Sequence, residues 1–242
     1  MSIPLLPGEP PELLVLDKPS RCPYLPERTA RLPLRLPIRE LSRRELDVRL
    51  ASGDRRQGFV LYRPECPECQ ACEPIRIPVR ELHRSRSLER SVRRGSRALT
   101  VEIGPPVMDA RRVELYNAHK LGRGLSDEPR QIEAADYTDF LVASSCESFE
   151  LRYLLAGSLV GVAVTDRAET ALSAVYCYYD PAHENLGIGT FSIMKQVELC
   201  LDWGLDYLYL GLYIGECERM RYKARFLPHE RLIGGEWRRF ER

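Results

Sequence analysis

Hydrophobic positions in the second half of the chain form short alternating segments, followed by a stretch with helical spacing. Three alternating segments predict strands, at residues 149–156, 159–165 and 172–179. Residues 187–203 carry apolar side chains at helical spacing, and residues 207–210 form another strand. The pattern predicts an antiparallel meander, a helix, and a strand that pairs beside the last strand of the meander.

The pattern in the first half of the chain predicts a smaller unit. Nine prolines before residue 40 exclude long helices there. Residues 40–53 fit a helix that ends at Gly53, and strands are expected at residues 58–64 and 75–79. We place a domain boundary near residue 100, which gives an N-terminal cysteine-bearing domain, residues 1–99, and a larger domain, residues 100–242.

Three further elements are expected before the meander. They are a β-like segment at residues 99–103, a helix from Asp109 to about His119, and a short helix at residues 137–144. The expected fold class is therefore α/β (α+β), with a mixed, mainly antiparallel sheet in the C-terminal domain.

Length and composition argue against a membrane-spanning or a secreted protein. The 242 residues are enough for two modest domains, each with its own core. No stretch approaches the roughly 18 to 20 apolar residues of a membrane span, and the start, MSIPLLPGEP, lacks the features of a secretory signal. We expect a soluble, cytoplasmic protein with no membrane partner, whose eight cysteines are in a reducing compartment.

Charge is unevenly distributed along the chain. The formal net charge is +1, but residues 73–97 contain eight Arg against three Glu. The chain has 32 Arg and only four Lys, so a general preference for arginine accounts for part of this cluster. Arg90, Arg93 and Arg94 are candidates for contacts with nucleic-acid phosphates, or alternatively for a solvated basic helix.

A glycine turn leads into the long predicted helix. Asn185, Gly187, Gly189 and Thr190 lie between the end of a strand and the helix start. Free backbone N–H groups and the positive end of the helix dipole meet there, and this geometry suits a phosphate. Ordinary turn glycines are an equal alternative. With the three strands before it and the strand after it, the turn resembles that of the acyl-CoA N-acyltransferase (GNAT) fold.

The C-terminal segment carries a more specific pattern. Residues 213–228 are YIGECERMRYKARFLP, and we call them the signature segment. They resemble the signature of the aminoacyl-tRNA-protein transferases, and two N-terminal motifs agree: CPYLP at residues 22–26 and YRPECPECQACEPIR at residues 62–76. Within this family the chain is most similar to the bacterial aspartate/glutamate leucyltransferases. Gly215, Glu216, Glu218 and Arg219 depart from the family pattern, which weakens the inference about the donor amino acid.

The resemblance implies a reaction and its partners. The α-amine of a protein that begins with Asp or Glu attacks the ester of leucyl-tRNA, which is the co-substrate, and the modified protein enters the N-end rule degradation pathway. No DNA partner is implied. Three alternatives stay open: arginine from arginyl-tRNA, a coenzyme A-dependent N-acyltransferase, and a zinc-containing RNA-binding or adaptor protein.

The resemblance also implies roles for residues in the matching motifs. Tyr222 and Lys223 are the catalytic candidates. An acidic substrate side chain calls for cations of fixed geometry. The candidates for binding the substrate are Arg76, Lys223, Arg225, Cys217 and Tyr213. The tRNA end is expected at Asn185, Gly187, Gly189 and Thr190, near the arginines of residues 73–97.

Four cysteines in the N-terminal half form a candidate metal site. Cys66, Cys69 and Cys72 lie in one short loop, and Cys22 adds a fourth thiol. Four thiolates suit tetrahedral zinc or an iron–sulfur cluster. The alternative is a reduced, metal-free loop beside the substrate amine, so no cofactor is certain from the sequence.

Overall fold

The structure is a computed structural model that describes residues 4–124 and 131–241. The helices are α1 (Arg43–Ala51), α2 (Arg86–Ala98), α3 (Ala110–Gly122), α4 (Ala134–Tyr137), α5 (Ile188–Asp202) and α6 (Glu218–Arg221). The strands before α2 are β1 (Leu5–Leu6), β2 (Glu12–Leu16), β3 (Ser20–Arg21), β4 (Thr29–Ala30), β5 (Leu34–Pro37), β6 (Arg55–Gln57), β7 (Val60–Tyr62) and β8 (Glu73–Pro78). The later strands are β9 (Leu99–Gly104), β10 (Ser148–Leu155), β11 (Ser158–Arg167), β12 (Ala171–Tyr179), β13 (Tyr207–Tyr213), β14 (His229–Ile233) and β15 (Glu236–Phe240).

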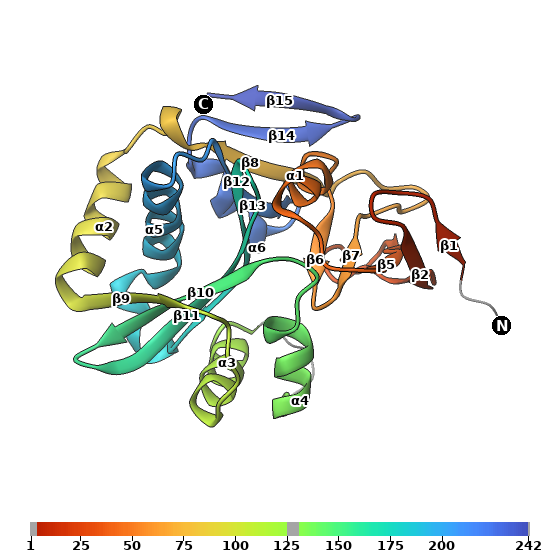
Figure 1. Cartoon of the computed structure of the whole chain (residues 1–242). Coiled ribbons are helices and arrows are strands. Elements are labelled where there is room, and N and C mark those ends of the chain that lie inside the picture. The colour runs from red at the N-terminus through yellow and green to blue at the C-terminus, as the bar shows by residue number, and fades with distance from the viewer. Residues whose placement is uncertain (1–3, 125–130, 242) are drawn as a thin grey trace.

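An eight-stranded sheet forms the centre of the molecule (Figure 1). Its order is β15-β14-β8-β13-β12-β11-β10-β9, and neighbouring strands are antiparallel except for the parallel pair β12 and β13. The meander β10-β11-β12, helix α5 and the strand beside β12 confirm the order predicted from the sequence. This order is that of an N-acyltransferase-like fold, and the mixed α/β class is confirmed.

Helices cover both faces of this sheet (Figure 1). On one face α2 lies beside α5, and the two approach closely because Gly95 has no side chain where the ring of Phe191 packs. A Cβ at position 95 would overlap that ring, so a larger residue would push the two helices apart. The other face is covered by α3 and α4, through buried residues such as Tyr116 and Tyr137, and by α1 nearer to β13.

The N-terminal region adds a second sheet, in the order β1-β2-β5-β7-β6, and the small hairpin β3-β4. Helix α1 is capped by Ser42, which forms a capping box with Glu45, and it confirms the helix expected at residues 40–53. Strand β8 comes from the same region but lies in the large sheet, between β14 and β13. The domain boundary near residue 100 stays a prediction.

The arginine-rich segment forms helix α2, capped by Ser85, which agrees with the basic helix considered for it. Other elements differ from the predicted ones. The short helix expected at residues 137–144 starts earlier, as α4, and continues as a π-helical turn over Thr138–Val142. The hairpin β14-β15 was not predicted. Among the described residues, no helix is long and apolar enough to cross a membrane.

Candidate active site

The parallel strands β12 and β13 stop pairing partway along their length. They pair at three positions, the last of which is Ser173 with Tyr209. Beyond it both strands are irregular: β12 has an extra residue between Ala174 and Tyr176 opposite β11, and β13 shifts register against β8 after Tyr209. Gly211 of β13 has φ of +86°, a backbone conformation that favours glycine. We call this point the β12–β13 fork.

A buried arginine from the N-terminal region lies at the fork. The guanidinium of Arg55, on β6, donates from Nη1 to Ser173 Oγ at 3.0 Å and from Nη2 to the carbonyl oxygen of Ala174 at 3.0 Å. A Cβ on Gly211 would lie 3.2 Å from Arg55 Nη2. The guanidinium therefore lies between the two strands just past their last pair, and it links the N-terminal region to the large sheet.

The start of α5 has the features expected of an anion site. Gly187, with φ of +69°, is the N-cap residue, and Gly189 and Thr190 form the first turn. Two arginines reach this place from other elements: Arg94 of α2 donates to the carbonyl oxygen of Asn185, and Arg225 donates to Thr190 Oγ1. Backbone N–H groups, the helix dipole and exposed guanidinium groups are thus brought together.

The other two arginines predicted to contact tRNA lie on the same helix as Arg94. Arg90 and Arg93 are exposed on α2, whose buried residues are Leu88 and Gly95. The basic face of α2 is therefore turned away from the sheet and accessible to a large partner.

Lys223 of the signature segment is buried. Its Nζ donates to the carbonyl oxygen of Leu212 at 2.6 Å and lies 3.3 Å from the sulfur of Met220. Burial, and after it the charge of Arg55, lower the pKa of Lys223 to about 7, while Cys217 and Cys72 oppose the change. The ammonium group therefore faces the Arg55 guanidinium and the cysteine loop.

Tyr222, the preceding residue, has different surroundings. Desolvation, together with Cys177 and Tyr179 of β12, raises the pKa of its phenol to about 12 against the opposing effect of Arg225. The residue as a whole is 46% exposed. Tyr222 thus lies toward β12 and the Arg225 side chain that contacts the start of α5, while Lys223 lies toward Arg55.

The predicted metal ligands do gather, but not as a metal site. Burial, and after it the thiols of Cys66, Cys22, Cys69 and Cys217, raise the pKa of the Cys72 thiol to about 12. The Sγ of Cys22 accepts a hydrogen bond from the backbone N–H of Leu25. In the parts of the chain that the structure describes, no three His, Cys, Asp or Glu side chains are grouped to hold a metal ion. The structure therefore gives the predicted zinc or iron–sulfur site no support.

Arg76 has its own partners within the protein. Its guanidinium donates from Nε to Glu230 at 2.7 Å and from Nη1 to the hydroxyl of Tyr209 at 3.0 Å. It is also stacked between the rings of Tyr207 and Trp237, at 3.8 and 4.1 Å from their centroids. The charge of Arg76 is thus already paired within the protein.

The two remaining candidates for binding the substrate, Tyr213 and Cys217, lie at the end of β13 and just before α6. Tyr213 ends β13 and packs under the guanidinium of Arg231, 4.8 Å from the ring centroid. Cys217 precedes α6 and lies close enough to Lys223 to affect its pKa. Cys217 is therefore one of the side chains near Lys223.

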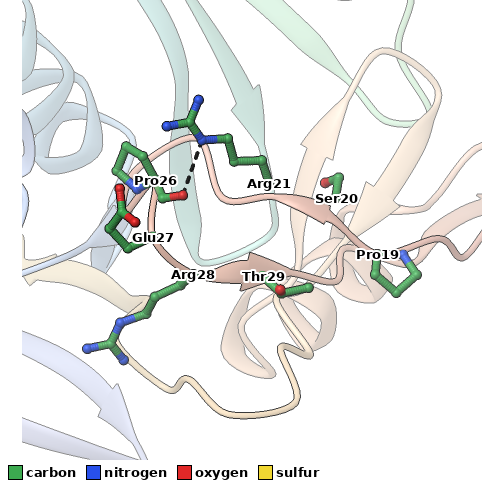
Figure 2. A pocket seen from close by; sticks show the side chains of 7 residues that line it. All are labelled: Pro19, Ser20, Arg21, Pro26, Glu27, Arg28 and Thr29. Atoms are coloured by element: carbon green, nitrogen blue, oxygen red, sulfur yellow. Dashed lines mark hydrogen bonds between the residues drawn. The ribbon is translucent and has the colours of Figure 1, made fainter.

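The β3-β4 hairpin borders the signature segment. Arg28 forms an ion pair with Glu216 at 3.5 Å, and the loop that carries Arg28 also carries Cys22 and Tyr24. Figure 2 shows a pocket of about 370 Å³ within this hairpin, where Arg21 Nε donates to the carbonyl oxygen of Pro26 at 3.1 Å. The pocket is lined by Pro19, Ser20, Arg21, Pro26, Glu27, Arg28 and Thr29, so it is separate from the fork.

Sequence reasoning missed Arg55 and Tyr62. Burial raises the pKa of Tyr62 and Arg55 opposes that rise, so the two side chains are close. No motif or periodicity distinguishes Arg55 from the other arginines of the chain. Tyr62 begins the motif at residues 62–76, in which the cysteines and Arg76 carry the more specific signal.

Three features together define an N-acyltransferase-like fold. They are the order of the strands, the separation of β12 from β13, and the start of α5, where backbone N–H groups and two arginines come together. Two family models match the sequence: "Arginine-tRNA-protein transferase, N terminus" over residues 20–90, and "Arginine-tRNA-protein transferase, C terminus" over residues 111–233. The chain belongs to this family of aminoacyl-tRNA-protein transferases, as the signature segment predicted.

Curated relatives match over nearly their whole length. A protein of Halorhodospira halophila is 39% identical over 222 residues, which are 90% of this chain and 92% of the relative. One of Thiobacillus denitrificans is 34% identical over 225 residues, 91% of either chain. Both are named aspartate/glutamate leucyltransferase. Among solved structures, the C-terminal domain of a putative lysylphosphatidylglycerol synthetase from Agrobacterium fabrum has a TM-score of 0.49 at 14% identity, covering 71% of this chain and 58% of that one.

Proposed function

We propose that this protein transfers leucine from leucyl-tRNA to the N-terminal α-amine of proteins that begin with Asp or Glu, in the cytoplasm, and so marks them for degradation by the N-end rule pathway. The observation that carries the proposal is the similarity, over about 90% of the chain, to relatives named aspartate/glutamate leucyltransferase. Both halves of the chain match the family models, so both substrates are expected to bind.

The reaction exchanges an ester for an amide. The neutral α-amine attacks the leucyl carbonyl carbon, the C–O bond to the terminal ribose breaks, and the ribose hydroxyl leaves with a proton while the amine loses one. An α-amino group has a pKa of about 7.7 to 8.0, so a useful fraction is neutral near pH 7 and no strong base is required. Positioning and charge stabilisation are the main tasks for the protein.

The donor is expected at the start of α5. The exposed guanidinium of Arg225, bonded to Thr190, and that of Arg94, bonded to Asn185, support binding of the terminal phosphates there. Arg90 and Arg93 extend the basic surface along α2 toward the body of the tRNA. Tyr222, beside β12, is suited to donate from its hydroxyl to the oxyanion that develops on the leucyl carbonyl.

The acceptor is expected on the other side of the signature segment. Lys223 presents a buried ammonium group there, and Cys217 and Cys72 lie around it. Tyr213 borders this side. Arg76, predicted to bind the acidic side chain, is the weaker candidate because Glu230 already pairs with it. No step of this reaction needs a metal.

One assay tests the function. The protein is incubated with labelled leucyl-tRNA or arginyl-tRNA and with peptides that begin with Asp, Glu, Lys or Ala. We expect leucine on the Asp and Glu peptides only. Transfer to Lys-starting peptides, preference for arginyl-tRNA, or acylation from acetyl-CoA in place of tRNA would overturn the proposal.

A further inference from the structure

Two buried cations at the fork differ from the other buried cations of the protein. Of the four buried arginines among the described residues, three pair with carboxylates: Arg35 with Glu12 and Asp54, Arg56 with Asp166, and Arg112 with Glu150. Arg55 and Lys223, with 8% and 7% of their surface exposed, form no ion pair with any described residue.

Neutral acceptors hold both groups in place. Arg55 donates to a serine hydroxyl and a backbone carbonyl, and Lys223 donates to the carbonyl oxygen of Leu212. These hydrogen bonds give the N–H groups acceptors but do not neutralise the positive charge. A buried charge without an ion-pair partner lowers the stability of the folded protein. The two like charges also repel each other, so an arriving anion would stabilise both.

The two cations come from parts of the chain that meet only in the folded protein. Arg55 lies on β6, and Lys223 lies in the 3₁₀ turn that follows α6. Tyr24, from the β3-β4 hairpin, lies close to Arg55, since burial raises the pKa of Tyr24 and Arg55 opposes that rise. A guanidinium and an ammonium on one anion suit a carboxylate, whose two oxygens accept from separate donors.

We propose that Arg55 and Lys223 together bind the side-chain carboxylate of the acceptor's N-terminal Asp or Glu. This inference rests on the proposed function and names the group that selects the acceptor. A tRNA phosphate meets exposed arginines at the start of α5 instead, on the side of Tyr222. The two proposed sites thus use different cations, and one cation of each, Lys223 and Arg225, lies in the same 3₁₀ turn.

The test compares Arg55→Gln and Lys223→Gln with Arg76→Gln in the full-length protein. Transfer is measured on peptides that differ only in starting with Asp or with Asn. We expect Arg55→Gln and Lys223→Gln each to raise the KM for the Asp peptide by about 10- to 100-fold, the effect of losing a charge-assisted hydrogen bond. The ratio of kcat/KM for the Asp peptide to that for the Asn peptide should fall, whereas a purely structural role would lower kcat for both peptides alike and leave this ratio unchanged.

The outcomes separate the inference from the proposed function. If the wild type moves leucine to no acidic peptide, the proposed function fails. If it does, and Arg76→Gln loses selectivity for Asp while Arg55→Gln and Lys223→Gln keep it, the inference alone fails. Circular dichroism checks that each variant is folded. Because the cations lie on different elements, misfolding of one variant leaves the other to decide, and Arg55→Lys should restore part of the selectivity.

Discussion

Tyr222 and Lys223 are consecutive in the chain, but their side chains lie in different surroundings. Cys177 and Tyr179 of β12 and the Arg225 guanidinium act on the pKa of the Tyr222 phenol, while Arg55, Cys217 and Cys72 act on the pKa of Lys223. In the function proposed above, the 3₁₀ turn that carries both residues lies between the donor and the acceptor. An amine bound near Lys223 would then have the leucyl ester close by, because both proposed sites use residues of this one turn.

The first prediction concerns the fork itself. Gly211→Ala should destabilise the protein and lower transfer, because alanine disfavours φ of +86° and its Cβ would lie 3.2 Å from Arg55 Nη2. Gly157→Ala is the matched control: its φ is +84°, and a Cβ there would have nothing within 4 Å. Urea unfolding should show a loss of about 1–3 kcal/mol for Gly211→Ala.

Both variants strain the backbone, but only Gly211→Ala crowds the guanidinium of Arg55. Their activities therefore show whether the position of Arg55 matters. We expect Gly157→Ala to retain the wild-type kcat/KM at temperatures at which it is folded, and Gly211→Ala to lose activity on Asp-starting peptides. Equal activity in the two variants would show that the position of Arg55 does not matter for transfer.

The second prediction concerns pH. Lys223 has a folded pKa of about 7 against an ordinary value of 10.5, mainly because of burial and then because of Arg55. Below about pH 7 the residue is protonated in the folded and unfolded states, so the cost of its buried charge is fully present. Between pH 7 and 10.5 the unfolded chain binds more protons, and this cost decreases as pH rises.

Compared with Lys223→Met, the wild type should therefore gain stability with rising pH. The gain is at most about 1.4 kcal/mol per pH unit, since one proton is involved. Urea unfolding of both proteins at pH 7, 8 and 9 measures it. Parallel curves for the two proteins would mean that the ammonium group is not desolvated.

Local signals account for the parts of the fold that were predicted. Helix α5, the meander and the capped helix α3 each carry their pattern within a few residues, and Asp109 caps α3 as expected. Arg55 carries no such signal, because its partner Ser173 is 118 residues away in the chain. Likewise the motif points to Arg76, but Glu230, which pairs with it, lies on a hairpin that no pattern predicted.

The third prediction concerns the basic face of α2. Replacing Arg90, Arg93 and Arg94 together by Gln should raise the KM for leucyl-tRNA and leave the KM for the acceptor peptide unchanged. The salt dependence of tRNA binding should also decrease, by a slope of about one for each phosphate that the variant no longer binds. Filter binding of leucyl-tRNA over a range of salt concentrations measures this slope.

The control is a second triple variant with the same net charge as the α2 variant. Arg39, Arg43 and Arg239 are also exposed arginines, and each already pairs with a glutamate. Replacing these three by Gln removes the same number of positive charges elsewhere on the surface. If both triple variants weaken tRNA binding equally, the effect is one of net charge, and α2 has no specific role.

The last prediction contrasts two adjacent arginines. Arg56 pairs with Asp166 through two bonds of 2.8 and 2.7 Å, with side chains only 2% and 1% exposed. Arg56→Met leaves a buried carboxylate without its partner and should cost about 3–5 kcal/mol of stability. Arg55→Met removes a buried cation that pairs with no described carboxylate, so its cost should be clearly smaller. A folded Arg55→Met protein that transfers leucine poorly to Asp-starting peptides would separate function from stability at neighbouring positions, whereas equal losses of stability would assign Arg55 a structural role.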